Sequence, residues 1–508
     1  MHRWLLFSLV VSLAPSGTAD RASFRVQSTT FDARTNDFIL TFNQPVDLES
    51  VNPESVSIVD QATGATVPFA RGHATSANDV LIRASAPMSS AAGYTLALNS
   101  RVPIRSVDGE FVVDKELHYV VPFGRGGGGG SGGNGKPPDP IQISAGAGYT
   151  CATRVNGTLM CWGDNTYGAV GVALADGTPI LEPTAVPTVS PVARLCGAVF
   201  IANCALSNTA NPPVLFMWGA NMSGQLGVAG NYSRFAPLQP NPNVQHPVDV
   251  ATNGQNTCAL RADGKIFCTG QNGVGMLGLG FAGPDIFGFT QPVVDPGPFT
   301  SVTMTGQGGA CALKTDSTVW CWGDNTWGES GDGKGGMNMN ALTLVPVQPV
   351  GLPKIRALAA SWGTVCALAL DGTVWCWGID LGLINDPMKE FQNTPVQKKG
   401  LTNIVSMSMN RDAGCGIDIN HDAWCWGADY VGQLGDGQAR NVAVPTPIKV
   451  ARPDGGTFLK LVVGFQHVCG LVTPQYRLYC WGDNSAGAFG IGKAAAGASL
   501  PTQSHFVP

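Results

Sequence analysis

Seven copies of a unit of about fifty residues constrain the fold of this chain more than any other feature of its sequence. The first cysteine of each unit follows the previous one after 49 to 55 residues, and the series is Cys151, Cys204, Cys258, Cys311, Cys366, Cys415 and Cys469. Such a period is typical of propellers and solenoids. Each unit reads as four short antiparallel strands separated by turns such as Asp371-Gly372. The repeats therefore predict an all-β, seven-bladed β-propeller over residues 141–508.

The spacing of the second cysteine in each unit predicts disulfides across a hairpin. A three-residue loop, Leu370-Asp371-Gly372, with its glycine in the left-handed conformation, places Cys366 opposite Cys376 and Ala367 opposite Trp375. In the second unit Met217 replaces the second cysteine and an additional Cys196 stands on the preceding strand, so we expect these neighbouring strands to be joined instead. The predicted pairs are Cys151–Cys161, Cys196–Cys204, Cys258–Cys268, Cys311–Cys321, Cys366–Cys376, Cys415–Cys425 and Cys469–Cys480.

The alternative for these cysteines is metal binding. Zinc sites favour two cysteines separated by two to four residues, and they collect four ligands. Neither feature is found among the cysteines of this chain. An even number of cysteines without an unpaired one is typical of an oxidised, exported protein.

The N-terminus has the features of a secretory signal over residues 1–19. A short polar start is followed by an apolar stretch from Trp4 to Leu13 and by small residues up to Ala19. The alternative is a buried N-terminal strand. No later segment approaches the ~18 apolar residues of a membrane helix. We therefore expect an exported monomer without a membrane span, in the cell envelope or outside the cell.

Residues 20–124 contain short alternating runs, such as Phe38–Phe42 and Tyr94–Leu98, which predict a β-sandwich. The stretches FILTFNQPVDLESVNPESVSI and YTLALNSRV resemble the bacterial Ig-like domain of S-layer and other envelope proteins. That resemblance implies a spacer or an adhesive module. Residues 125–140, RGGGGGSGGNGKPPDP, read as a flexible glycine linker followed by a stiffer proline segment.

Recurring motifs of the seven units point to one family. They include Cys258-Ala259-Leu260-Arg261-Ala262-Asp263-Gly264 and Trp426-Gly427 followed by Gly432-Gln433-Leu434-Gly435. These motifs resemble the repeats of the regulator of chromosome condensation family, which implies a seven-bladed propeller. The family includes a nucleotide-exchange factor for a small GTPase and secreted binders such as an inhibitor of β-lactamases. Nuclear members carry a histidine shortly before the first cysteine, and only His467, two residues before Cys469, does so here.

No motif of the chain predicts a catalytic, cofactor or metal site. The seven histidines are scattered, and no zinc-protease, nucleophile-elbow or calcium-loop spacing is present. With 30 basic against 35 acidic residues and no Lys/Arg blocks, nucleic-acid binding is not expected either. Six tryptophans share one repeat position and could form a carbohydrate-stacking row, but packing between blades is the favoured interpretation. They are Trp162, Trp218, Trp322, Trp377, Trp426 and Trp481.

A position four residues before each first cysteine is the candidate binding surface. The chain turns there between two strands, and the residue varies from unit to unit while its neighbours repeat. The series is Ala147, Phe200, Gly254, Gln307, Trp362, Arg411 and Phe465. Aromatic residues and arginine are favoured at interaction hot spots, and Trp362 is the best candidate for an exposed anchor. For Phe200 and Phe465 the alternative is that they cap blades as packing residues.

The sequence thus predicts a non-catalytic binding or adhesion scaffold that recognises a protein or glycan through one mouth of the propeller. The second hypothesis is a propeller that inhibits, or acts as an exchange-factor-like regulator of, a specific protein. The third is an enzyme, which carboxylates or histidines clustered at the propeller mouth would favour.

Overall fold

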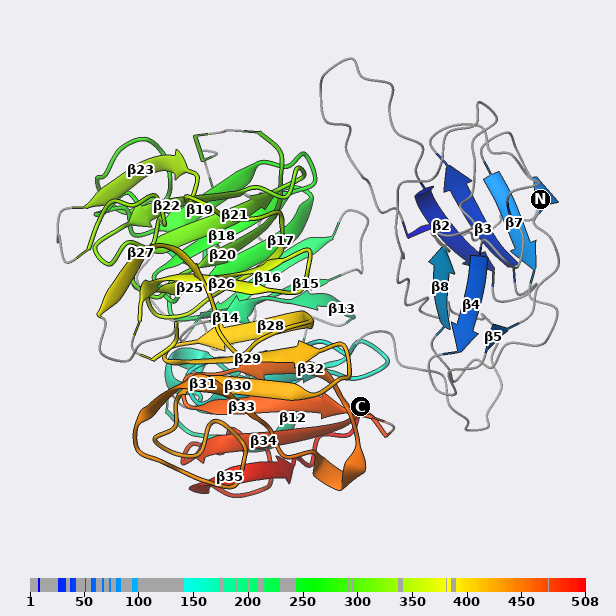
Figure 1. The fold of residues 1–508 in the computed structure, drawn as a ribbon. Coiled ribbons are helices and arrows are strands. Elements are labelled where there is room, and N and C mark those ends of the chain that lie inside the picture. Colours follow the sequence, from blue (N-terminus) through cyan, green and yellow to red (C-terminus); the bar gives the residue numbers. More distant parts are fainter. Residues whose placement is uncertain are drawn as a thin grey trace, which may run out of the picture. The chain divides into compact units, whose positions relative to one another are not determined.

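The computed structural model describes two units of the chain, residues 1–139 and 140–508 (Figure 1). In the first unit it describes Val51 and the strands named below. In the second it describes residues 141–508 except 173–176, 188–190, 199–201, 208–212, 229–243, 290–292, 295–296, 337–340, 381, 385–389 and 474.

The described strands of the first unit form two antiparallel sheets. One sheet has the order β1 (Ser8–Leu9), β2 (Val26–Asp32), β3 (Asp37–Phe42), β7 (Asp79–Arg83) and β6 (His73–Ala74). The other has the order β5 (Thr66–Val67), β4 (Val56–Asp60) and β8 (Tyr94–Leu98). The runs predicted as strands at 38–42 and 94–98 are strands, whereas the Ig-like domain stays a prediction and the predicted linker lies outside the described residues.

The predicted signal segment contains one described element. Ser8–Leu9 forms β1, which pairs with Thr29 and Thr30 of β2. The strand agrees with the alternative of a buried N-terminal strand, whereas its burial and the cleavage after Ala19 stay predictions.

The second unit is an all-β propeller of seven blades, coloured cyan to red in Figure 1. Blade 1 contains β9 (Ile143–Ala145), β10 (Tyr149–Thr153), β11 (Leu159–Gly163) and β12 (Ile180–Ala185). Blade 4 contains β20 (Phe299–Met304), β21 (Gly309–Lys314), β22 (Val319–Asp324) and β23 (Leu342–Val347). Blade 5 contains β24 (Ile355–Ala360), β25 (Thr364–Ala369), β26 (Val374–Ile379) and β27 (Phe391–Gln397). Blade 6 contains β28 (Ile404–Asn410), β29 (Ala413–Asp418), β30 (Ala423–Ala428) and β31 (Ala443–Lys449). Blade 7 contains β32 (Phe458–Val463), β33 (His467–Val472), β34 (Arg477–Asn484) and β35 (Ala495–Gln503).

Blades 2 and 3 depart from the predicted pattern of four antiparallel strands. The described part of blade 2 has three strands, β13 (Val192–Leu195), β15 (Ala202–Ser207) and β16 (Val214–Gly219). After Cys196 the chain leaves this sheet, and β14 (Gly197–Ala198) pairs in parallel with β17 (Pro247–Thr252) of blade 3, beside β18 (Asn256–Arg261) and β19 (Ile266–Gly270). A sequence period cannot reveal such a switch, because the two residues concerned form a bridge to a different repeat.

The hairpins have the predicted register, and it brings the cysteines together. Gly372 has φ of 81° and its amide donates to the Ala369 carbonyl at 3.1 Å, which closes the three-residue loop. Cys366 then lies directly opposite Cys376, with their Cα atoms 4.1 Å apart, and the pair forms a disulfide. All seven disulfides join the pairs that the spacing predicted, Cys196–Cys204 of blade 2 included.

The six tryptophans of the repeat position are fully buried between blades, at 0–1% exposure, and do not form a carbohydrate-stacking row. The Trp377 indole donates to the Glu329 carbonyl of the preceding blade at 2.7 Å, and the Trp162 indole donates to the Ala488 carbonyl at 2.8 Å. In blade 3, where threonine replaces tryptophan, the Thr269 hydroxyl donates to the Gly224 carbonyl of blade 2 at 2.9 Å. Five of the six tryptophans and Thr269 thus donate a hydrogen bond to a neighbouring blade, whereas the Trp426 indole has no hydrogen-bond partner among the described residues.

The ring closes where blade 7 packs against blade 1. The His467 Nε2 atom lies 2.9 Å from the Thr150 hydroxyl, which in turn donates to the Ala488 carbonyl at 2.9 Å. Complete burial lowers the pKa of His467 to about 4, so its imidazole is neutral in the folded protein at neutral pH. His467, which lies two residues before Cys469, therefore has a structural role at the closure.

Candidate functional site

The turns that join the first strand of each blade to the second lie at one end of the propeller. We call them the turn ring, and its described residues are 146–148, 253–255, 305–308, 361–363, 411–412 and 464–466. The sequence singled out one position in each turn, and the structure places these positions at the same end of the propeller. They are Ala147, Gly254, Gln307, Trp362, Arg411 and Phe465, whereas Phe200 lies outside the described residues.

Backbone hydrogen bonds connect neighbouring turns of the ring across blade boundaries. The Gln307 amide donates to the Trp362 carbonyl at 2.8 Å, and the Trp362 amide donates to the Arg411 carbonyl at 3.3 Å. Where the ring closes, the Phe465 amide donates to the Gly146 carbonyl at 3.0 Å. Because main-chain atoms hold the turns, the side chains at these positions can differ without loss of the contacts.

The candidate side chains are less exposed than the sequence suggested. Trp362 is half-buried rather than an exposed anchor, because its turn is bonded on both sides and its neighbours Ser361 and Gly363 are buried. Gln307 and Phe465 are half-buried as well, whereas Gly254 is buried and offers no side chain. The ring therefore presents partial surfaces of several residues rather than one protruding aromatic group.

Arg411 and Phe465 form one continuous contact on blades 6 and 7. The Arg411 guanidinium lies 4.0 Å from the centre of the Phe465 ring, which is cation–π distance. Its Nε atom lies 3.1 Å from the Asp412 carboxylate, and its side chain is 37% exposed. Burial raises the pKa of Asp412, and the nearby Arg411 opposes that rise. Arg411 also adopts a positive φ of 41°, which non-glycine residues rarely do.

A buried carboxyl group lies beneath the Trp362 turn. Glu329 is 1% exposed, and its Oε2 atom accepts a hydrogen bond from the Trp327 amide at 2.9 Å. Its Oε1 atom faces Gly363 and has no hydrogen-bond partner among the described residues. Burial, together with the nearby Asp324, raises the pKa of Glu329 to about 8. The neutral carboxyl is therefore its predominant form at neutral pH.

In blade 2 the equivalent residue is a glutamine, and both ends of its amide are hydrogen-bonded. The Gln225 Oε1 atom accepts a hydrogen bond from the Ser223 amide at 2.9 Å, and its Nε2 atom donates to the Gly254 carbonyl of the next blade at 2.6 Å. Gly254 and Trp362 occupy the same repeat position, and a protonated carboxyl can donate as an amide does, whereas a carboxylate cannot. Sequence reasoning missed Glu329, whose only signal is that glutamate replaces glutamine in the repeated Gly-Gln-Leu-Gly motif.

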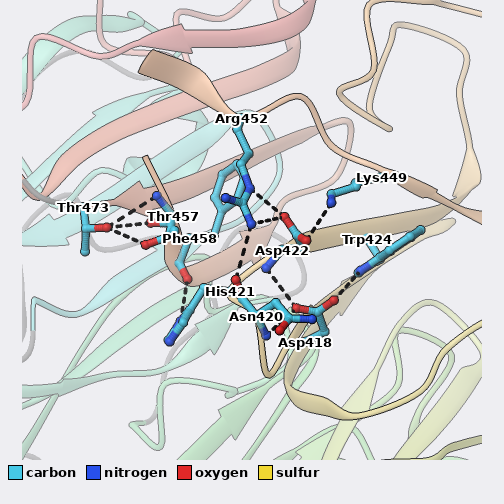
Figure 2. Close-up of polar contacts among 10 residues, drawn as sticks. All are labelled: Asp418, Asn420, His421, Asp422, Trp424, Lys449, Arg452, Thr457, Phe458 and Thr473. Atoms are coloured by element: carbon cyan, nitrogen blue, oxygen red, sulfur yellow. Dashed lines mark hydrogen bonds and ion pairs between the residues drawn. The ribbon is translucent and has the colours of Figure 1, made fainter. Parts of the chain in front are cut away.

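At the opposite end of the propeller, hairpin tips are held by their own side chains (Figure 2). The Asp422 carboxylate binds the Arg452 Nε atom at 2.6 Å and the Lys449 Nζ atom at 2.6 Å. The Phe458 amide donates to the His421 carbonyl at 3.2 Å, which joins this tip of blade 6 to blade 7. Because one carboxylate is shared by both cations, the cluster is a structural connection.

The inner strands of the blades surround a central cavity of about 220 Å³. Most of its lining residues have apolar side chains, Val250, Leu358 and Met407 among them, and its charged residues are Arg194 and Asp249. No group of three or more His, Cys, Asp or Glu side chains in the described part of the chain is arranged to hold a metal ion. No helix among the described residues is long and apolar enough to cross a membrane.

Comparisons with known proteins agree with this architecture. Residues 141–169 and 248–275 match the family described as Regulator of chromosome condensation (RCC1) repeat. The two matched segments lie in blades 1 and 3. The ultraviolet-B receptor UVR8 of Arabidopsis thaliana is 24% identical over 370 residues, which cover 69% of this chain and 79% of UVR8. The E3 ubiquitin-protein ligase HERC2 of Homo sapiens is 25% identical over 367 residues, which cover 68% of this chain and 7% of HERC2.

A solved structure shows the same fold. Prp20p from Saccharomyces cerevisiae superposes with a TM-score of 0.59 at 19% identity, and the match covers 68% of this chain and 85% of Prp20p. At this level of identity the likeness concerns the fold, the seven-bladed propeller, and not the residues of a site.

Proposed function

We propose that the propeller is a non-catalytic binding scaffold that recognises a protein partner through the turn ring. One observation supports this proposal above all. Backbone hydrogen bonds hold Trp362 and Arg411 in place, while the side chains of both residues stay partly accessible to a partner. A tryptophan and an arginine on a preorganised backbone are a favourable combination for a protein hot spot, because little conformational freedom is lost on binding.

A protein partner is favoured over a glycan by two observations. The buried tryptophan row provides no stacking platform for sugars, and the Prp20p structure is described by its binding to Gsp1p and histones, which are proteins. The second candidate, an inhibitor or regulator of one specific protein, uses the same surface and differs in what binding does to the partner.

We also propose that the protein resides in an oxidising compartment, either outside the cell or in the cell envelope. Seven disulfides and no free cysteine among the described residues support it, because disulfides persist in such compartments. In this proposal residues 1–19 are the export signal, and residues 20–124 form an Ig-like module that the linker 125–140 tethers to the propeller.

The test is a pull-down with the full-length exported protein as bait, followed by binding measurements on the protein it captures. Trp362→Ala combined with Arg411→Ala should weaken that complex at least about tenfold, as expected for central hot-spot residues. The matched control is Leu370→Ala, which truncates a 59% exposed residue on a hairpin tip at the other end. Equal affinities of the double variant and the wild type would refute the turn ring as the binding surface, and a glycan as the sole ligand would refute the protein partner.

A further inference from the structure

The central opening at the hairpin end of the propeller, where the first, innermost strand of each blade begins, lies opposite the turn ring. Its surface differs from that of the turn ring. Exposed apolar side chains stand there at the starts of three inner strands, and they are Val248 (42%), Val405 (41%) and Leu459 (36%). Three cationic side chains lie at the second or third residue of the first strand in other blades or in the same blade. They are Arg194 of blade 2, Arg356 of blade 5 and Lys460 of blade 7. We call these six residues the basic mouth.

Each cation reaches across a blade boundary. The Arg194 guanidinium binds the Asp249 carboxylate at 2.8 Å, Arg356 donates to the Ile404 carbonyl, and the Lys460 Nζ atom donates to the Ile141 carbonyl at 2.9 Å. Blades 2, 5 and 7 are separated by one or two blades around the ring, so the cations surround the opening instead of clustering on one side.

Two of these three charges have no anionic partner among the described residues. Only Arg194 forms an ion pair with a described residue, and its partner Asp249 is buried. Arg356 and Lys460 contact carbonyl oxygens, and partial burial lowers the pKa of both groups. The mouth therefore carries an excess of positive charge that is partly removed from water.

A structural connection between blades does not need these charges. The Ser144 hydroxyl donates to the Cys196 carbonyl at 2.8 Å between blades 1 and 2. The Ser408 hydroxyl accepts a hydrogen bond from the Val463 amide at 3.0 Å between blades 6 and 7. Neutral groups make these contacts without the cost of desolvating a charge. Arg356 and Lys460 make this kind of contact with a charged group instead, and both side chains remain at least partly exposed, so their charge is available to an anionic ligand.

We propose that the basic mouth binds an acidic peptide segment with interspersed apolar residues. Its carboxylates pair with Arg356 and Lys460, and its apolar side chains pack on Val405 and Leu459. Charge complementarity selects an acidic ligand, and the apolar residues beside the cations select a peptide over a small inorganic anion. This site is at the other end of the propeller from the turn ring and does not depend on the function proposed for that ring.

The test uses the full chain and a short fluorescent peptide of alternating glutamate and leucine, with fluorescence anisotropy as the readout. The matched peptide replaces each glutamate by glutamine. We expect the acidic peptide to bind, the neutral peptide to bind at least about tenfold more weakly, and added salt to weaken binding. Equal binding of both peptides, no binding of the acidic peptide, or tighter binding of polygalacturonate would overturn the proposal.

Variants locate the site. Arg356→Gln and Lys460→Gln keep a donor for the carbonyl but remove the charge, and each should weaken acidic-peptide binding about three- to tenfold. Lys460→Arg keeps the charge and should bind as the wild type does, which separates loss of charge from loss of folding. The control is Lys334→Gln, an 81% exposed lysine in the loop after β22, at the turn-ring end. A loss of affinity in the control equal to that in Lys460→Gln would contradict a local site.

Discussion

The two ends of the propeller are built from the same strands and are stabilised in different ways. At the hairpin end, an Asn or Asp side chain holds the tip in blades 1, 3, 4, 5 and 6, as the Asp371 carboxylate does by accepting hydrogen bonds from the Thr373 amide and hydroxyl at 2.9 and 2.7 Å. At the turn-ring end, backbone groups of Gln307, Trp362 and Arg411 bond to one another across blades. At the hairpin end the side chains stabilise the turns, so the same residue types must recur from blade to blade. At the turn-ring end the backbone stabilises the turns, so the side chains can differ and can contact a partner.

The largest predicted loss of stability comes from comparing two tryptophans of strand β26, one in the core and one nearer the hairpin end. Trp377 is fully buried and bonded to blade 4, whereas Trp375, on the same face of β26, is half-buried. Trp377→Ala should lower the free energy of unfolding by about 3–5 kcal/mol. Trp375→Ala should cost about 1 kcal/mol, because it loses less buried apolar surface. Urea unfolding measures the free energy of unfolding of both variants. Equal losses would show that the difference in burial between the two tryptophans does not affect stability.

The disulfides should contribute less than the buried tryptophans. Replacing both Cys366 and Cys376 by serine removes a cross-link over 10 residues of sequence separation. The chain-entropy model gives a loss of about 2–3 kcal/mol for a loop of this size. The double variant Cys196→Ser with Cys204→Ser is the comparison, since that loop has a separation of 8. Unchanged unfolding midpoints under non-reducing conditions would show that the hairpins hold the blades without the cross-links.

The buried carboxyl beneath the turn ring predicts a pH dependence. In the folded protein the pKa of Glu329 is raised to about 8, against 4.5 for the ordinary group. The stabilisation from its neutral form is complete below pH 4.5 and is lost as the pH rises to about 8. Glu329→Gln should remove this slope and raise stability at pH 8.5 by about 1–3 kcal/mol, because glutamine stays uncharged at every pH and its burial therefore costs no desolvation of a charge.

The comparison with blade 2 makes this pH prediction specific. Gln225→Glu introduces the same carboxyl at the equivalent position and should create a new loss of stability as the pH rises. Thermal unfolding between pH 5 and pH 8.5 measures both variants against the wild type. Parallel curves for the wild type and Glu329→Gln would contradict the idea that Glu329 acts as a protonated substitute for glutamine.

The smallest effect belongs to the hairpin tips. Asp371→Ala removes two hydrogen bonds at an exposed tip and should cost about 0.5–1 kcal/mol. It should leave binding at the turn ring unchanged. Isothermal calorimetry with the captured partner checks this, and a tenfold loss of affinity would mean that the two ends have been assigned the wrong roles.

The parts of this structure that depend on short sequence distances could be predicted. The left-handed Gly372 sets the register of its hairpin, and that register brings Cys366 and Cys376 together, so the disulfides followed from spacing alone. Contacts between blades could not be predicted, because they join residues about fifty positions apart through packing geometry. The half-burial of Trp362 and the carboxyl of Glu329 beneath it both depend on such contacts.

Hydrogen–deuterium exchange of the full-length protein with and without its captured partner tests the central claim most directly. The account predicts that binding protects the amides of residues 361–363, 411–412 and 464–466, while the hairpin tips near Asp371 and Asp422 exchange as before. Protection confined to the hairpin tips, with the turn ring unchanged, would contradict the assignment of recognition to the turn ring.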